Sequence, residues 1–372
     1  MAVPAEVVRA VRTVYGESAE LVGVELPGDW QVGRLRVLTP GGPVRLVAKW
    51  LRSNPLGWRT DPRQQAIEAA GLGFVNGLTP GMVPQLIAAE LDPRTGGVVL
   101  LEDLSPREPL DAIIRRAGVT ATERARLAYA RALGRLAAVT AGRDQEFRSR
   151  LAGHTDQRLR LMGPPWEQQR RTLEAFGVAV PAAAEQEVIK LQALLADPGP
   201  YLALSNCDMS ENNFMIDIDD PDDHGRLIDF ESAQFDHALA HAANFFVPGP
   251  CWMVVDDPIG DQLEAAFRTA LAGGIPEAAD DQGYRLGVAA GCVAMGFERC
   301  GNLTVMDRRP AGHPSRIQRI ATLEAAADAA ETRGLWGALT DVLRDLARRL
   351  RHRWPDADVE LAELAPYTPR PA

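Results

Sequence analysis

The stretch that decides the fold is LSNCDMSENNF at residues 204–214, which is followed by LIDFE at residues 227–231. In the first stretch a carboxylate, Asp208, precedes an amide, Asn213, by five residues. The second stretch places another carboxylate, Asp229, at the end of a short apolar run. Taken alone, an Asp and a following Asn have a simple structural interpretation, in which a loop Asp and a strand-end Asn satisfy backbone groups. Other parts of the sequence indicate that these side chains act together.

The segments that carry these side chains have the pattern of a β-hairpin. Two short β-like runs, 212–218 and 225–230, are joined by an acidic turn. A hairpin would place Asn213 and Asp229 side by side on neighbouring strands. Amide and carboxylate oxygens are the hard ligands that Mg²⁺ prefers, and Asp208 could accept a hydrogen bond from an attacking hydroxyl. These are the groups that phosphoryl transfer needs.

A lysine far upstream suits the same chemistry. Lys49 ends the strand-like run 44–50, and strand alternation puts Val47 on the same face. The ammonium could then pair with the phosphates of a nucleotide whose adenine lies near Val47. Glu68, on an expected helix, is the natural counter-ion of a partly buried lysine. The alternative is a surface lysine with an exposed glutamate.

Together with the hinge-like run VVLLEDLSP at 98–106, these residues resemble the aminoglycoside phosphotransferase and choline kinase-like family. The resemblance covers roughly residues 20–250. It implies an α+β, kinase-like fold of two lobes, with ATP, or GTP, held between them. It also implies transfer of the γ-phosphate to a hydroxyl of a small molecule, with Asp208 orienting the hydroxyl and with Mg²⁺ held by Asn213 and Asp229. The expected nucleotide-binding residues are Val47, Lys49, Glu68, Leu101, Glu102, Asp103 and Leu104.

The chain departs from the family pattern in three places. Asn206-Cys207 replaces the His-Gly that commonly precedes the catalytic Asp, and Ala240 stands where an Asp follows the metal ligand. The turn Pro27-Gly28-Asp29 is shorter than a glycine-rich loop. We expect altered loop packing with activity retained. The departures at Asn206, Cys207 and Ala240 favour a second interpretation, a catalytically weak nucleotide-binding regulatory protein on this fold.

The sequence leaves the acceptor open among an antibiotic such as an aminoglycoside, an amino alcohol, a sugar and a nucleoside-like metabolite. No long segment ending in A-P-E follows Asp229, which argues against a protein kinase. We expect the acceptor to lie against the helices after residue 250. Candidate contacts are the acidic Asp256, Asp257, Asp261 and Glu264 and the aromatic Trp252 and Trp336.

Hydrophobic periodicity and turn signals predict an N-terminal lobe, residues 1–104, and a mainly helical lobe, residues 105–372. In the second lobe Thr120 and Glu123 fit a capping box at a helix start. In the first lobe we expect a short opening helix ended by Gly16, strands at 20–26, 31–38, 44–51, 83–88 and 97–101, and a helix containing Glu68. In the second we expect helices at 255–275, 280–300, 313–332 and 334–352 and an irregular Pro-rich tail at 366–371.

Other motifs have simpler interpretations. His237 and His241 are spaced to share a helix face but lack a third zinc ligand. The acidic stretch 217–223 lacks the glycine and closing glutamate of a calcium loop. Gly71-Leu72-Gly73 is interpreted as a helix C-cap and loop, and the arginines at 348–353 as the solvated face of a helix.

The bulk composition excludes several classes of partner. A net charge of −10 would repel nucleic acid and an anionic membrane surface. We find neither a signal peptide nor an apolar run of membrane-spanning length, so the expected compartment is the cytoplasm. Four cysteines without metal-ligand spacing are expected to be reduced and structural. The sequence does not distinguish between a monomer and a homodimer.

Overall fold

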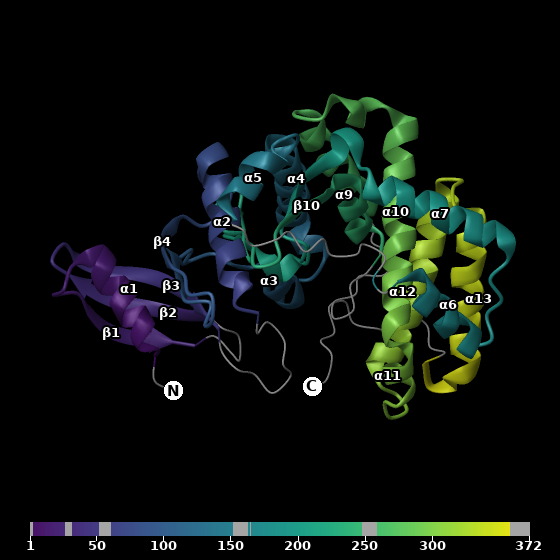
Figure 1. Ribbon diagram of the computed structural model, residues 1–372, viewed down its shortest axis with the longest axis horizontal. Helices are drawn as coiled ribbons and strands as arrows, with labels where there is room; N and C mark the ends of the chain where they lie inside the picture. The colour runs from purple at the N-terminus through teal and green to yellow at the C-terminus, as the bar shows by residue number, and fades with distance from the viewer. Residues whose placement is uncertain are drawn as a thin grey trace.

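The computed structural model describes residues 3–26, 32–51, 61–151, 163, 165–247 and 259–357. It is an elongated molecule with an antiparallel sheet at one end and a bundle of helices at the other (Figure 1). The sheet has the strand order β1-β2-β3-β5-β4. Its strands are β1 (Glu20–Glu25), β2 (Val32–Thr39), β3 (Gly42–Trp50), β4 (Leu86–Glu90) and β5 (Val98–Glu102).

Strand alternation gives this sheet two buried faces. On one face Val98 and Leu100 pack with α1 (Ala5–Tyr15), whose inward side carries Val7 and Val11. The alternate residues of β5 join the main core, to which α2 (Arg63–Leu78) also belongs. The sheet therefore offers its second face, with the ends of β3 and β5, to the helical lobe.

The helical lobe contains two small sheets, β6-β8-β9 and β10-β7, within its helices. Their strands are β6 (Glu108–Pro109), β7 (Leu202–Ser205), β8 (Phe214–Ile216), β9 (Arg226–Leu227) and β10 (Gln234–His237). The helices are α3 (Leu110–Ala117), α4 (Glu123–Thr140), α5 (Asp144–Arg150), α6 (Trp166–Ala175), α7 (Ala182–Ala196), α8 (Ala238–His241), α9 (Gly260–Ala272), α10 (Asp281–Glu298), α11 (Leu303–Asp307), α12 (Pro314–Thr332) and α13 (Gly337–Arg353).

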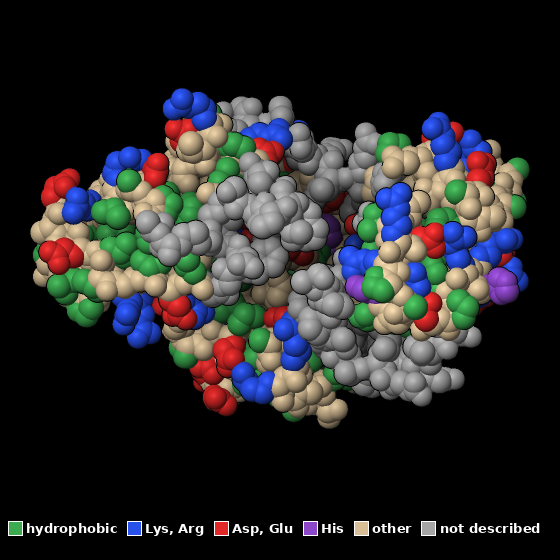
Figure 2. All heavy atoms as spheres, turned by 90° about the horizontal axis from the view of Figure 1, so that it is seen from below, with side chains coloured by type: hydrophobic (Ala, Val, Ile, Leu, Met, Phe, Trp, Pro, Cys, Tyr) green, Lys and Arg blue, Asp and Glu red, His purple; other side chains and the backbone are tan. Residues whose placement is uncertain are grey.

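The surface carries charges of both signs over both lobes in the face shown in Figure 2. Some are paired across helices, as in Arg344 with Asp328 and Arg351 with Glu324. None of the helices in the described ranges is long and apolar enough to cross a membrane.

The structure confirms the predicted fold class. The opening helix, the first three strands and the hairpin are found close to their expected limits, and in the hairpin Phe214 of β8 pairs with Leu227 of β9. The strand expected at 83–88 begins later, at Leu86, because Pro84 has no N–H to donate to a ladder. The turn at 27–29, the segment 248–258 and the tail at 366–371 lie outside the described residues.

Three local predictions were wrong. Thr120 caps no helix; it begins a 3₁₀ turn, and the Thr122 hydroxyl donates backward to the Gly118 and Val119 carbonyls. Gly71 lies inside α2, where a Cβ would stand 3.1 Å from the Cβ of Phe230, so its role is close packing. His237 ends strand β10 and does not share a helix with His241.

Candidate active site

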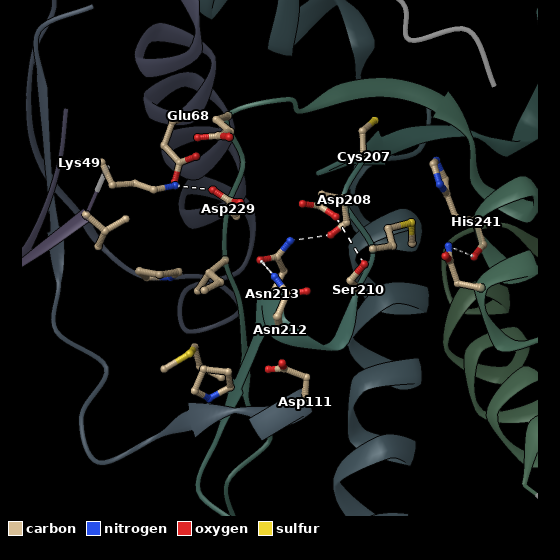
Figure 3. Close-up of a pocket in the computed structure, with 18 of the residues that line it drawn as sticks. Lys49, Glu68, Asp111, Cys207, Asp208, Ser210, Asn212, Asn213, Asp229 and His241 are labelled. Carbon is tan, nitrogen blue, oxygen red and sulfur yellow. Dashed lines mark hydrogen bonds and ion pairs between the residues drawn. The ribbon is translucent and has the colours of Figure 1, made fainter. Parts of the chain in front are cut away.

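The residues predicted to bind the nucleotide and the metal, together with Asp208, all line one cavity of about 1150 Å³ (Figure 3). Its walls come from β3, α2 and β5 on the side of the sheet, and from the segments flanking the β8–β9 hairpin on the side of the helices. The fold therefore brings Lys49 to Asp229, 180 residues further along the chain. The predicted residues among the lining are Val47, Lys49, Glu68, Leu101, Glu102, Asp103, Leu104, Asp208, Asn213 and Asp229.

Lys49 is held by two carboxylates at one end of the cavity (Figure 3). Its Nζ lies 2.9 Å from Oε1 of Glu68 and 2.6 Å from Oδ1 of Asp229. Burial acts to lower the pKa of Lys49, but the carboxylates of Asp229, Glu68 and Glu231 outweigh it and raise that pKa. The lysine therefore stays charged, and the expected ion pair with Glu68 is present.

The contact of Lys49 with Asp229 was not predicted from the sequence. Asp229 follows the hairpin and adopts a left-handed backbone conformation, with φ of 65°. A non-glycine residue there is uncommon and is often found at functional sites. The conformation belongs to the turn after β9, and its sequence signal is only the position of an Asp at a strand end.

The loop before Asp208 is tied to the segment of Asp229. Asn206 Nδ2 donates to the carbonyl of Ile228 at 3.1 Å and to that of Asp208 at 3.4 Å. Cys207 has φ of 57°, and its N–H donates to Ser205 Oγ. Burial and the nearby Asp236 raise the pKa of the Cys207 thiol, which is therefore protonated at neutral pH. The hydrogen bonds of Asn206 and Cys207 thus tie this loop to Ile228 and Ser205.

Asn213 connects the same loop to the hairpin. Its Nδ2 donates to the Asp208 carbonyl at 2.8 Å, and its own carbonyl accepts from the Ile228 N–H at 2.9 Å. The Asn213 side-chain oxygen accepts from Asn212 Nδ2 at 2.9 Å. Because Ile228 precedes Asp229, the backbone of Asn213 lies next to the strand end that carries the second expected metal ligand. A shared metal site remains a prediction.

The connection after β5 borders the cavity on the side of Val47. Val47 pairs with Leu101 in the β3–β5 register, and both line the cavity. The Glu102 N–H is already engaged by the Gln85 carbonyl at 3.0 Å. Two residues further on, we find no protein acceptor for the Leu104 N–H within the described residues. The next turn is closed by the N–H and hydroxyl of Ser105, which both donate to Asp103 Oδ1.

Sequence reasoning missed the far end of the cavity, away from Lys49. Here α8 and the last turns of α10 form the wall, and a Cβ on Gly291 would lie 2.5 Å from the Cα and carbonyl oxygen of Ala240. The glycines at 287 and 291, four residues apart on α10, were the available signal for this close packing. Lining residues at this end include Asp236, Ala240, His241, Asn244, Ala294, Met295, Glu298 and Arg299.

Of the acceptor contacts expected from the sequence, those in the described residues do not line the cavity. Glu264 pairs with Arg333 at 2.9 Å, and Trp336 is buried before α13. Asp261 lies at the exposed start of α9. Trp252, Asp256 and Asp257 lie outside the described residues. The end of the cavity away from Lys49 is instead lined by residues of α8 and α10.

The fold and the composition of this cavity define the class of structure, a two-lobed kinase-like fold with an antiparallel sheet joined to a larger helical lobe. No family model matches the sequence, and no curated protein matches it. Among solved structures, the GDP complex of a variant of aminoglycoside 2'-phosphotransferase IIIa has a TM-score of 0.50 at 14% identity, over 90% of this chain and 98% of that one.

Two further solved structures of small-molecule kinases match at lower TM-scores. An ethanolamine kinase of Plasmodium vivax has a TM-score of 0.48 at 10% identity, over 86% of this chain and 85% of that one. A microcompartment-associated aminopropanol kinase has a TM-score of 0.42 at 15% identity, over 95% of this chain and 99% of that one. At 14% identity, the likeness to the aminoglycoside phosphotransferase shows the fold alone.

Proposed function

We propose that this protein is a phosphotransferase that moves the γ-phosphate of Mg-ATP to a hydroxyl group of a small molecule. The observation that carries the proposal is the meeting, in one cavity, of a charged and buried Lys49 with Asp208, Asn213 and Asp229. A protein that only binds a nucleotide has no need of both the expected metal ligands and a carboxylate for the acceptor. The GDP held by the structurally similar aminoglycoside phosphotransferase agrees with a nucleotide in this fold.

The nucleotide fits the end of the cavity formed by the sheet. Val47 and Leu101 provide apolar surface for the base, and the Leu104 N–H is a donor for a ring nitrogen. Lys49, held by Glu68, would bind phosphate oxygens. Its contact with Asp229 then has to loosen or be shared as the nucleotide enters, because Asp229 is also an expected metal ligand.

The residues present fit a magnesium ion. The carboxylate of Asp229 and the side-chain oxygen of Asn213 are hard oxygen donors, and the remaining ligands of Mg²⁺ in such sites are phosphate oxygens and water. When bound, the ion would neutralise charge on the phosphates. Asn212, which now donates to the Asn213 oxygen, would have to give up that bond.

Asp208 accepts the hydrogen bond of the acceptor hydroxyl and orients its oxygen toward the γ-phosphorus. A bond forms between that oxygen and phosphorus while the bond from phosphorus to the β–γ bridging oxygen breaks, and ADP leaves. The hydroxyl proton passes to the Asp208 carboxylate and then to solvent. Asn206 and Asn213 hold the loop in place during this step through their bonds to Ile228 and Asp208.

Calorimetric titration of the full chain with ATP, with and without Mg²⁺, tests the nucleotide site. Lys49→Ala should weaken Mg-ATP binding by roughly 10- to 100-fold, because charge-assisted hydrogen bonds contribute about 1.5–3 kcal/mol. Lys190→Ala, on the exposed face of α7, is the matched control and should bind normally. Equal affinity in the wild type and in Lys49→Ala, whether or not Mg²⁺ is present, would exclude the proposed nucleotide site.

The replacements at Asn206, Cys207 and Ala240 keep one alternative in view, a nucleotide-binding regulatory protein. The structure gives the loop residues a positioning role, since Asn206 bonds to Ile228 and Asp208. Such a role is compatible with catalysis. Phosphate transfer by wild type and by an Asp208 variant separates the two functions.

A further inference from the structure

The cavity end remote from Lys49 has a cationic side chain that the transfer mechanism does not use. Arg299 follows α10 and lines the cavity with Met295 and Glu298 from the last two turns of that helix. In Figure 3, His241 marks this end, and Asp208 lies between it and Lys49. If the proposed function holds, on which this inference rests, the acceptor occupies this end.

Within the described part of the chain, Arg299 lacks the hydrogen-bond acceptors that a buried guanidinium usually has. Its side chain is 20% exposed, its Nε is buried with no partner among the described residues, and its Nη1 lies 3.5 Å from Oε1 of Glu298. That distance is too long for a hydrogen bond of ordinary strength. Glu298 itself is 43% exposed, and an ion pair so open to water contributes little.

Other arginines of the helical lobe show the contrast. Arg107 binds both oxygens of the buried Asp223, with Nε–Oδ2 and Nη2–Oδ1 distances of 2.9 Å. Arg333 donates to Glu264 and to the Ala329 carbonyl, each at 2.9 Å. A largely buried guanidinium without such partners is unfavourable unless water or a ligand supplies acceptors. Arg299 opens onto a cavity large enough for a ligand.

The side chains near Arg299 suit a ligand with an apolar stem. Ala294 and Met295 offer apolar surface one turn before it on α10. His241 of α8, which lines the same end, is buried, and burial lowers its pKa to about 4. Its ring is therefore neutral at physiological pH and brings no second positive charge. Asp208, which is expected to bind the acceptor hydroxyl, lines the same cavity.

We propose that Arg299 binds a carboxylate of the acceptor, so that the substrate is a hydroxy acid whose hydroxyl faces Asp208. The planar fork of a guanidinium matches the two oxygens of a carboxylate. A phosphate would match it as well, but the cavity already carries negative charge. Its lining includes Asp208, Asp229, Glu231 and Asp236, and the cavity would also hold the phosphates of ATP. A singly charged group is repelled less by these charges than a doubly charged one.

Calorimetry on the full chain, with Mg²⁺ and a non-hydrolysable ATP analogue and also without nucleotide, tests this assignment. The probes are short hydroxy acids, their primary amides, hydroxyalkyl phosphates and amino alcohols of matched length. We expect an acid to bind roughly 10- to 100-fold more tightly than its amide. A hydrogen bond to a charged group contributes about 1.5–3 kcal/mol, which corresponds to about that ratio of affinities. Arg299→Gln should abolish the preference, and Arg299→Lys should keep part of it. Arg285→Gln, at an exposed arginine of α10, should leave the preference unchanged.

Several results would overturn the assignment while leaving the proposed function intact. Wild type that binds Mg-ATP but binds the amide, the phosphate or the amino alcohol at least as well as the acid, or binds none of the probes, contradicts a carboxylate site. Arg299→Gln that keeps the preference, or that weakens nucleotide binding alone, assigns the arginine another role. A variant with a lower melting temperature and unchanged acid binding makes Arg299 a stabiliser of the α10 terminus. Loss of Mg-ATP binding in the wild type would instead refute the proposed function.

Discussion

Asp229 has two tasks at the residue scale, since it pairs with Lys49 at 2.6 Å and is the expected metal ligand. Its left-handed backbone, with φ of 65°, turns the carboxylate toward the lysine. Lys49 pairs with Asp229 and Glu68, and all three side chains are largely buried. On binding of Mg-ATP, Lys49 would contact phosphate oxygens of the nucleotide and Asp229 would bind the metal ion in place of the lysine.

Two buried histidines predict a pH dependence of stability. Burial lowers the pKa of His241 to about 4, and burial together with the neighbouring His241 lowers that of His237 to about 4. The unfolded chain takes up these protons below about pH 6.5, whereas the folded chain does not until about pH 4. The free energy of unfolding should therefore be unaffected by these groups above neutrality and fall as pH drops from 6.5 to 4.

Each histidine should remove about 2 kcal/mol of stability between pH 7 and pH 5. Urea unfolding at both pH values measures the loss, and His241→Gln should lose about that much less than the wild type. His224→Gln, at an exposed position, is the control and should behave like the wild type. Equal losses in all three proteins would show that His241 is not kept neutral by the fold.

The meeting of Lys49, Asn213 and Asp229 in one cavity was predictable because each is a chemically distinctive side chain at or next to the end of a strand. Lys49 ends β3, and Asn213 and Asp229 flank the hairpin, so periodicity and turn signals sufficed. Arg299 and His241 were not predictable in this way. They line the same cavity because α10 packs on α8, and no local pattern encodes which helices meet.

At the scale of elements, glycines set how closely α8 and α10 approach. The Cβ added by Gly291→Ala would lie 2.5 Å from the backbone of Ala240, closer than any real contact, so one helix must move. We expect a loss of about 1–3 kcal/mol in unfolding free energy, which is typical of overpacking. Because the helices form one wall of the cavity, ligand binding should weaken as well.

Gly337→Ala is the matched control for that substitution. Gly337 begins α13, and an added Cβ there meets no atom within 4 Å. Its unfolding free energy should be unchanged or higher by up to about 1 kcal/mol, since alanine restricts the unfolded chain. Chemical denaturation of both variants decides; a Gly291→Ala protein as stable as Gly337→Ala would show that the helices are not in tight contact.

Helices and strands were predicted correctly where hydrophobic periodicity was strong. The predictions were wrong where contacts with distant parts of the chain determine the local structure. The alternating strands of the sheet were found within a few residues of their predicted limits. Gly71 was mistaken for a helix end because a local rule cannot see Phe230, which packs against it from the other lobe. The Thr120 capping box failed because Thr122 bonds backward to Gly118 and Val119.

At the scale of the molecule, the two lobes meet at the residues that the proposed reaction needs. Lys49 of β3 reaches Asp229 of the helical lobe, and α2 packs on Phe230 through Gly71. The site is thus assembled only when both lobes are folded. Together its residues support one hypothesis, that a phosphate is transferred in this cavity. That hypothesis depends most on Asp208.

The most direct test is transfer of labelled γ-phosphate from ATP to a panel of hydroxylated small molecules, by the wild type and by Asp208→Asn. The wild type should yield a labelled acceptor, and Asp208→Asn should lower kcat by roughly 10²- to 10⁴-fold, or about 3–5 kcal/mol of barrier, with Mg-ATP affinity and melting temperature nearly unchanged. A variant that keeps wild-type turnover, or a wild type that binds Mg-ATP and labels no acceptor, would contradict the account.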